Sequence, residues 1–167
     1  FARSTWDSFQ ASIQHPDHPF ALIHGDFHAQ NMMLRAACKN AGRKGGAALS
    51  VFDWSEVGPG CPMTDLGQMM ISDVPREVWK SHGLDLVKDY WNALLARGVD
   101  EYSFPFDRCW ALFETAGVQK WIWLFPIMAK FVPPHTLVFF QRQLEAFIAD
   151  HGDYDSYQIH SSMLLLL

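Results

Sequence analysis

Four polar side chains lie within eight positions of one short stretch, between two apolar runs. In ALIHGDFHAQNMML, residues 21–34, they are His24, Asp26, His28 and Asn31. Carboxylate and amide oxygens suit hard cations such as Mg²⁺, whereas imidazole nitrogens suit zinc and proton transfer. The same residue types are also common in turns, where they hydrogen-bond to nearby backbone. The stretch is therefore consistent with a braced loop, a metal site or a proton-transfer site.

A further acidic residue, Asp53, directly follows the apolar run LSVF, and Asn31 directly precedes the apolar run MML. If these two runs pair as a hairpin, Asn31 and Asp53 lie at the same end of neighbouring strands. An amide oxygen and a carboxylate there form a site suited to Mg²⁺, which takes one or two protein ligands and completes its shell with water and phosphate. Asp26 would lie close enough to such a site to accept a proton from a hydroxyl nucleophile.

The segments around these residues predict a small β-hairpin. Residues 31–36, NMMLRA, and 48–54, ALSVFDW, are typical of two short strands, and residues 20–24, FALIH, are extended. The stretch ACKNAGRKGG at 37–46 contains Gly and Asn and predicts a flexible, basic loop at the hairpin tip. The stretch VGPGCP at 57–62 predicts a turn because it is rich in Gly and Pro.

Helical periodicity marks a short segment before the hairpin and most of the chain beyond it. Gly98 is a natural C-terminal stop for one helix, and Pro126 predicts a kink or break in another. The expected fold class is therefore α+β and mostly helical, with the polar residues at the edges of the hairpin. The predicted helices cover residues 4–14, 64–72, 75–98, 104–131 and 134–152.

Length and composition are those of one globular domain with a substantial core. The chain has 167 residues, of which 49% are hydrophobic and 14% aromatic. A net charge of -5 argues against a general nucleic-acid-binding surface. Lys120 and Lys130 interrupt the most apolar stretch, so we expect no membrane span. Cys38, Cys61 and Cys109 form no CxxC pair, which favours a reducing, cytoplasmic location.

Two stretches resemble the catalytic and metal loops of the aminoglycoside phosphotransferase and choline-kinase-like family. They are HGDFHAQN at 24–31 and SVFDWSEVGPGCPMTDL at 50–66. A later stretch, YWNALLARGVDEYSFPFDRCW at 90–110, resembles the helix-turn-helix of the CHK-type, ecdysteroid-kinase-like members. The resemblance covers roughly residues 20–125 and implies a protein-kinase-like fold, of which this chain carries the large C-terminal lobe.

The resemblance implies an ATP- and Mg²⁺-dependent phosphotransferase that moves the γ-phosphoryl group to a hydroxyl of a small molecule. Asp26 corresponds to the catalytic base and Asn31 to a Mg²⁺ ligand. Asp53 corresponds to the Mg²⁺ ligand that also bridges the nucleotide phosphates. In such enzymes catalysis is mostly positioning and charge neutralisation. The expected partners are ATP and a small-molecule alcohol, whose identity the fold leaves open, as it does the oligomeric state.

The resemblance also implies supporting roles around the same loop. His24 would brace the loop, and Asp65 would hold it by accepting backbone hydrogen bonds. His28 corresponds to a position where the family also tends to have His, and we expect it to support the loop. For both histidines we favour a structural role over a direct part in the chemistry.

In two respects the chain departs from the family pattern. The family's smaller lobe, with its phosphate-covering loop and nucleotide-contacting Lys, has no counterpart upstream of residue 20. We therefore expect residues 1–167 to form a single domain that corresponds to the C-terminal lobe alone. A basic insertion at 35–46 also lengthens the interval between the two strands, which a hairpin tip tolerates.

Two other functions are compatible with the sequence. A large lobe without a nucleotide-clamping partner would fit a truncated, catalytically inactive binding module. The segment GDFH also resembles the Gly-Asp-x-His of metallophosphatases, in which His24, Asp26 and His28 would bind Zn²⁺ or Mn²⁺. We consider this second alternative the weaker one, because the other histidines do not stand in the further ligand segments that such enzymes need.

Overall fold

A computed structural model of the protein describes residues 21–35 and 48–151. The helix predicted over residues 4–14 and the basic loop predicted at 37–46 lie outside these ranges. Short strands and one 3₁₀ turn come first along the described chain, and long α-helices follow. In chain order the elements are β1 (Ala21–Ile23), η1 (Ala29–Asn31), β2 (Met32–Arg35), β3 (Ala48–Val51), β4 (Gly58–Gly60), α2 (Met63–Asp73), α3 (Arg76–Leu95), α4 (Phe106–Met128) and α5 (Pro134–His151). The described part is thus mostly helical with small antiparallel sheets.

The strands form two separate two-stranded antiparallel sheets. β2 pairs with β3, with Met32 opposite Val51 and Arg35 opposite Ala48, so the predicted hairpin is confirmed. β1 pairs with β4 rather than with the hairpin. The chain therefore leaves β1, forms the hairpin, and returns to pair with β1 before the helices begin.

The turn predicted over 57–62 was wrong at its centre, because Gly58–Gly60 forms β4 and pairs with β1. A strand of sequence GPG has no alternating apolar residues, so it gives no period-two signal. Pro59 lacks an N–H group, which a strand with a free edge tolerates. Gly60 allows the two strands to approach closely, because a Cβ atom there would lie 2.5 Å from the Ile23 side chain.

The four helices predicted within the described ranges are confirmed as α2 to α5. Gly98 has a φ of 93° and donates its N–H to the Leu95 carbonyl, as expected of a residue that ends α3. Pro126 does not break α4, which runs through it and ends two residues later at Met128. A proline removes one helical hydrogen bond and can bend the helix at that point. Because Pro126 lies in the last turn of α4, very few helical residues follow it, so a bend there has little effect on the helix.

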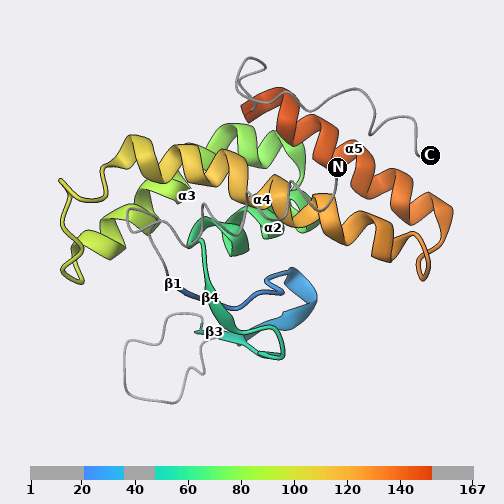
Figure 1. The fold of residues 1–167 in the computed structure, drawn as a ribbon, viewed down its shortest axis with the longest axis horizontal. Helices are drawn as coiled ribbons and strands as arrows, with labels where there is room; N and C mark the ends of the chain where they lie inside the picture. Colours follow the sequence, from blue (N-terminus) through green and yellow to red (C-terminus); the bar gives the residue numbers. More distant parts are fainter. Residues whose placement is uncertain (1–20, 36–47, 152–167) are drawn as a thin grey trace.

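The helices pack together and the strands lie on one side of them, as Figure 1 shows. The core lies among the helices, where Trp79, Phe113, Trp121 and Phe147 are at most 2% exposed. The aromatic richness of the second half of the sequence thus serves packing. None of the helices in the described part of the chain combines the length and apolarity that a membrane crossing requires.

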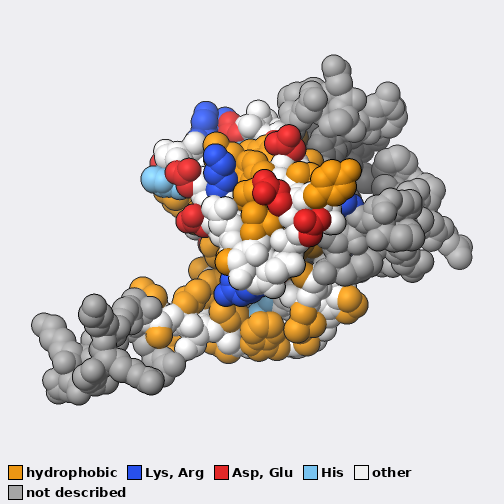
Figure 2. All heavy atoms as spheres, turned by 90° about the vertical axis from the view of Figure 1, so that its left-hand side faces the viewer, with side chains coloured by type: hydrophobic (Ala, Val, Ile, Leu, Met, Phe, Trp, Pro, Cys, Tyr) orange, Lys and Arg blue, Asp and Glu red, His pale blue; other side chains and the backbone are white. Residues whose placement is uncertain are grey.

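The strands, in contrast, keep large apolar side chains at the surface, and Figure 2 shows hydrophobic atoms along this part of the molecule. The exposed fraction is 76% for Leu22 on β1, 70% for Leu34 on β2 and 57% for Leu49 on β3. Two-stranded sheets this short bury little area by themselves. Their position therefore depends on contacts with the helices, and these contacts converge on the loop between β1 and η1.

Candidate active site

The loop from His24 to His28 is attached to the first turn of α2 through Asp65. The Asp65 carboxylate accepts the backbone N–H of His24 at 2.7 Å and that of Gly25 at 3.0 Å. Gly25 has a φ of 86°, a conformation that favours glycine. A Cβ atom at Gly25 would also lie 2.3 Å from the Glu56 carbonyl oxygen, so no larger residue fits there. Glycine at position 25 is thus required by the path of the backbone.

His24 lies beneath this loop and is only 2% exposed. Its Nε2 contacts the Phe52 carbonyl oxygen at 2.9 Å, and the Asp26 N–H donates to its Nδ1 at 3.3 Å. Since a carbonyl only accepts and an amide only donates, the ring is the neutral tautomer with the proton on Nε2. Its ring also packs against Trp54, with centroids 4.6 Å apart. Both ring nitrogens are therefore used within the protein, which disfavours His24 as a ligand of Zn²⁺ or Mn²⁺.

Both oxygens of the Asp26 carboxylate have polar neighbours. Gln68 donates its Nε2–H to Oδ1 at 2.9 Å, and the Lys120 ammonium lies 3.6 Å from the same oxygen. The His28 Nε2 lies 3.2 Å from Oδ2, and the Asn31 Nδ2 donates to Oδ2 at 3.3 Å. The Asp26 side chain is still 33% exposed, so a substrate group can reach it from solvent.

These neighbours determine the charge of Asp26. Burial by itself raises the pKa of the carboxyl group, but the hydrogen bond from Gln68 and the charges of Lys120 and His28 lower it. The net result is a pKa below the ordinary value. Asp26 is therefore ionised at neutral pH and able to accept a hydrogen bond from an alcohol.

Asn31 ends the one-turn helix η1 and is 7% exposed. Its Nδ2 donates to the Asp26 backbone carbonyl at 3.0 Å as well as to the Asp26 carboxylate. These acceptors fix the orientation of the amide group, so its oxygen Oδ1 is the atom turned to other partners. Oδ1 makes no hydrogen bond within the described ranges, and an amide oxygen of this kind is a suitable Mg²⁺ ligand.

Asp53 follows β3 at the same end of the hairpin as Asn31. The Phe52 N–H donates to the Asn31 carbonyl at 3.1 Å, and Met32 pairs with Val51, so the predicted neighbourhood of the two segments is confirmed. The Asp53 side chain is exposed, and within the described part of the chain it forms no hydrogen bond or ion pair with Asp26 or Asn31. The structure thus brings the backbones together without joining the two side chains.

Asp53 also has an unusual backbone conformation. Its φ is 60°, and among the described residues it is the one non-glycine residue with a positive φ. Asp tolerates this region better than most residues, but the conformation is uncommon and is often found at functional sites. Residues 21–35 and 48–151 contain no group of three or more His, Cys, Asp or Glu side chains arranged for a metal ion. An Asn and one Asp remain a sufficient protein contribution for Mg²⁺.

Four residues of this site were missed by the sequence reasoning. Gln68, 2% exposed on α2, accepts the Phe27 N–H at 3.1 Å while it donates to Asp26. Asp73, at the end of α2, accepts the Ala29 N–H at 3.0 Å. The others are Lys120 on α4 and Glu56 in the turn after Asp53. A possible signal for Gln68 was its spacing of three from Asp65, which places both on one face of a helix.

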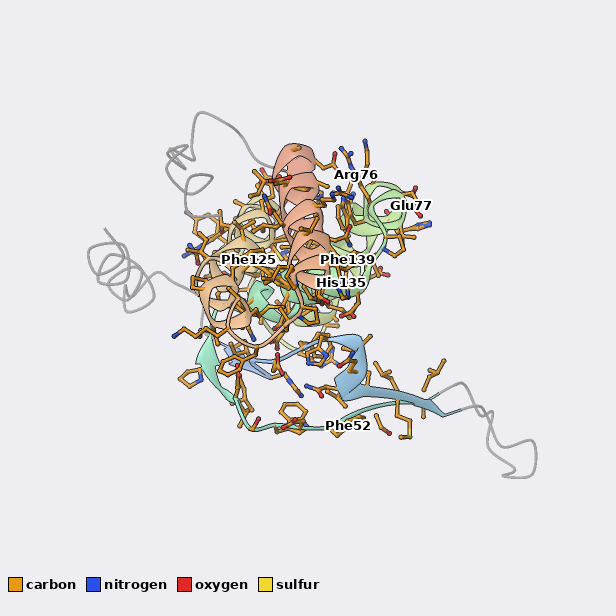
Figure 3. All side chains as sticks on the ribbon, turned by 90° about the vertical axis from the view of Figure 1, so that its right-hand side faces the viewer. Phe52, Arg76, Glu77, Phe125, His135 and Phe139 are labelled. Atoms are coloured by element: carbon orange, nitrogen blue, oxygen red, sulfur yellow. The ribbon has the colours of Figure 1, made fainter. Side chains whose placement is uncertain are left out.

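The labelled side chains in Figure 3 show where this site lies relative to the strands and the helices. Phe52, which carries the carbonyl that binds His24, lies with the strands, and it is 43% exposed. Phe125, His135 and Phe139 lie with α4 and α5. The site therefore lies where the strands meet the helices, with its loops on the strand side and its supports on the helical side.

Comparison with known proteins identifies the family of the chain. The model of the phosphotransferase enzyme family (APH) matches residues 2–107, more than half of the chain, and the match includes the whole loop and the turn after β3. The comparisons with curated proteins and with solved structures gave no match. The chain belongs to the phosphotransferase enzyme family.

Proposed function

We propose that the protein transfers the γ-phosphoryl group of ATP to a hydroxyl group of a small molecule, with Mg²⁺ as cofactor. The observation that carries this proposal is the ionised Asp26, held through both carboxylate oxygens beside an Asn31 whose amide oxygen has no protein partner within the described ranges. A fixed carboxylate next to a hard-oxygen site is the arrangement that phosphoryl transfer to an alcohol needs.

The proposal includes the fold. We infer that the described residues form the large C-terminal lobe of a protein-kinase-like fold, in which the hairpin carries the catalytic and metal loops. Support comes from the family match and from the separation of a helical core from two small sheets. In such a lobe the helices supply rigidity, and the loops on the strand side supply the reacting groups.

Asn31 Oδ1 and the Asp53 carboxylate would hold the metal ion. Mg²⁺ supplies positive charge that neutralises and orients the phosphate oxygens during transfer. The donor set fits this ion, because both atoms are hard oxygens and neither has a protein hydrogen-bond partner within the described part of the chain. The positive φ of Asp53 turns the chain sharply just after β3, so its carboxylate leaves the strand at the hairpin end that Asn31 shares.

Asp26 would accept a hydrogen bond from the acceptor hydroxyl and orient it towards the phosphoryl group. Because its pKa is lowered, Asp26 is a weak base, and proton transfer to it would come late, when the hydroxyl has become acidic. This timing suits the loose transition state of phosphoryl transfer. We assign Asp65, His24 and His28 to support of the loop, since each contacts loop backbone or the Asp26 side chain.

The test is a screen in which the native gene product is incubated with Mg²⁺-ATP and a series of alcohols. Release of ADP is the measure of transfer. Asp26→Asn should abolish transfer and leave nucleotide affinity nearly unchanged, because it removes the base but keeps the side-chain shape. Asp53→Ala should weaken binding of Mg²⁺-nucleotide itself. Asp85→Asn, on the exposed side of α3, is the matched control and should behave like the native protein. Full transfer activity in the Asp26→Asn protein would refute the assignment of the base.

A further inference from the structure

A buried lysine reaches the candidate site from a helix far along the chain. Lys120, on α4, is 4% exposed, and its ammonium group donates to the Gly25 carbonyl oxygen. The same nitrogen lies 3.4 Å from Glu56 Oε2 and 3.6 Å from Asp26 Oδ1. A buried cation is costly unless it is paired and hydrogen-bonded. Here the partners come from two separate segments, the loop with Asp26 and the turn that follows Asp53.

These two segments also touch each other through their backbones at the same place. Gly25 lies so close to Glu56 that a Cβ atom on Gly25 would be 2.3 Å from the Glu56 carbonyl oxygen. Glu56 belongs to the short turn after Asp53, in which the Val57 N–H donates to the Trp54 carbonyl at 3.2 Å. The Lys120 ammonium thus spans a contact that already joins the loop and the turn.

We propose that Lys120 is a positioning residue for phosphoryl transfer, because its ammonium group fixes the loop that carries Asp26 against the turn that directly follows Asp53. The inference rests on the proposed function. In-line transfer requires the base and the metal-bound phosphate to keep one relative position, and a shift of about 1 Å can cost about 100-fold in rate. A charge at the end of a stem packed in α4 is a rigid means of holding that position.

Lys120 acts through these two segments and through the Asp26 carboxylate, 3.6 Å from its ammonium, rather than on atoms of the substrate. Its side chain is almost fully buried, and it is engaged with the backbone of Gly25. Loss of its charge should therefore lower kcat, while the KM for ATP should change little, because Lys120 is not among the residues proposed to hold the metal and the nucleotide.

The variants are chosen so that the protein still folds. Lys120→Met keeps the apolar stem in its buried path and removes only the ammonium group. The two carboxylates that it leaves are reachable by water, since the Glu56 side chain is 51% exposed and that of Asp26 is 33% exposed. Glu56→Gln is a second, milder variant at the same contact. Lys130→Met, at an exposed position just beyond α4, makes the same change of charge and is the control.

Two quantities are measured in the native gene product and in each of its variants. The first is the kcat and KM for ATP with an alcohol identified in the screen. Lys120→Met should reduce kcat by about 10-fold to 100-fold with KM changed less than about threefold, and Lys120→Arg should recover part of the loss. The second is hydrogen exchange of the Asp26 and Phe27 amides, which bond to His24 and Gln68. Their exchange should be faster in Lys120→Met and unchanged in Lys130→Met.

A folded Lys120→Met protein with native kcat and native amide exchange would overturn the inference. Failure of the proposed function would give a different result, because the native protein itself would then release no ADP with any alcohol. In that case the exchange measurement alone decides whether Lys120 holds the loop against the turn. Faster amide exchange in Lys120→Met but not in Lys130→Met supports this role, and equal exchange in the two variants overturns it.

Discussion

Gly67 on α2 and Gly117 on α4 touch each other through their backbones. A Cβ atom at Gly67 would lie 2.5 Å from the Gly117 Cα, and one at Gly117 would lie 2.6 Å from the Gly67 Cα. This crossing point adjoins the supports of the site, because Gln68 follows Gly67 directly and Lys120 lies three residues beyond Gly117. The close approach of the two helices therefore sets how far both side chains reach towards Asp26.

Gly117→Ala should lower the free energy of unfolding by about 1–3 kcal/mol, because the new methyl group forces the two helices apart. Gly83→Ala is the matched control on α3, where the nearest atom to a new Cβ lies at 4.0 Å. There alanine fits and favours the helix, so stability should rise by about 0.5–1 kcal/mol. Urea unfolding followed by circular dichroism measures both changes. Equal effects of the two substitutions would show that the helix crossing tolerates a side chain.

Asp65→Asn should destabilise the protein by about 1–3 kcal/mol, although the two side chains have nearly the same shape. An amide offers one acceptor oxygen, whereas the native carboxylate accepts the N–H groups of both His24 and Gly25. One buried N–H would thus face the amide nitrogen. The same substitution at Asp85, which is exposed on α3, should change stability little. Unfolding at matched pH distinguishes the two, and an unchanged Asp65→Asn protein would contradict the prediction.

Gln68→Met should slow phosphoryl transfer by up to about 100-fold, because the loop loses two hydrogen bonds that fix the reacting carboxylate. The native amide accepts the Phe27 N–H and donates to Asp26 Oδ1, and methionine does neither. Gln141→Met on α5 is the control, since Gln141 bonds to Glu145 on its own helix. Steady-state rates with saturating ATP measure the effect. Native rates for Gln68→Met would mean that Asp26 keeps its position without this bridge.

Asp150 makes stability dependent on pH. Its carboxylate accepts from Arg76 Nε at 2.8 Å, Arg76 Nη2 at 2.6 Å and Trp79 Nε1 at 3.0 Å, and the hydrogen bonds from Arg76 hold its pKa well below the ordinary value. Because the folded-state pKa is lowered, the stabilisation is complete above about pH 5 and is lost as the pH falls below about 4. The unfolded chain then binds a proton that the folded chain does not.

Asp150→Asn should therefore lose part of the acid-induced decrease in stability between about pH 5 and pH 3. The free energy of unfolding in urea, measured at several pH values, gives this slope for each protein. Asp89→Asn, on the exposed side of α3, is the control and should keep the native slope. An identical slope in all three proteins would show that the α3–α5 contact does not carry the acid sensitivity.

The sequence was most informative where structure depends on near neighbours. The four helices, the hairpin and the stop at Gly98 follow from periodicity and from local backbone preferences, and each is present. The placement of Asn31 and Asp53 at one end of the hairpin follows from strand pairing alone. The GPG strand escaped prediction because it exists only through its pairing with β1, and its own residues carry no strand signal.

What the sequence by itself determined was thus the four described helices, the hairpin, the loop from His24 to Asn31 and the family to which these motifs belong. Tertiary structure alone decided which further side chains, beyond His24 and Asp65, hold the loop in place. Gln68 meets Phe27 across 41 residues, and Lys120 meets Gly25 across 95 residues. The physical reason is that a helix position is specified by its neighbours within a turn or two, whereas contacts across such separations depend on how closely α2 and α4 pack. That packing is set at Gly67 and Gly117, where the absence of two side chains brings the supports of Asp26 within reach.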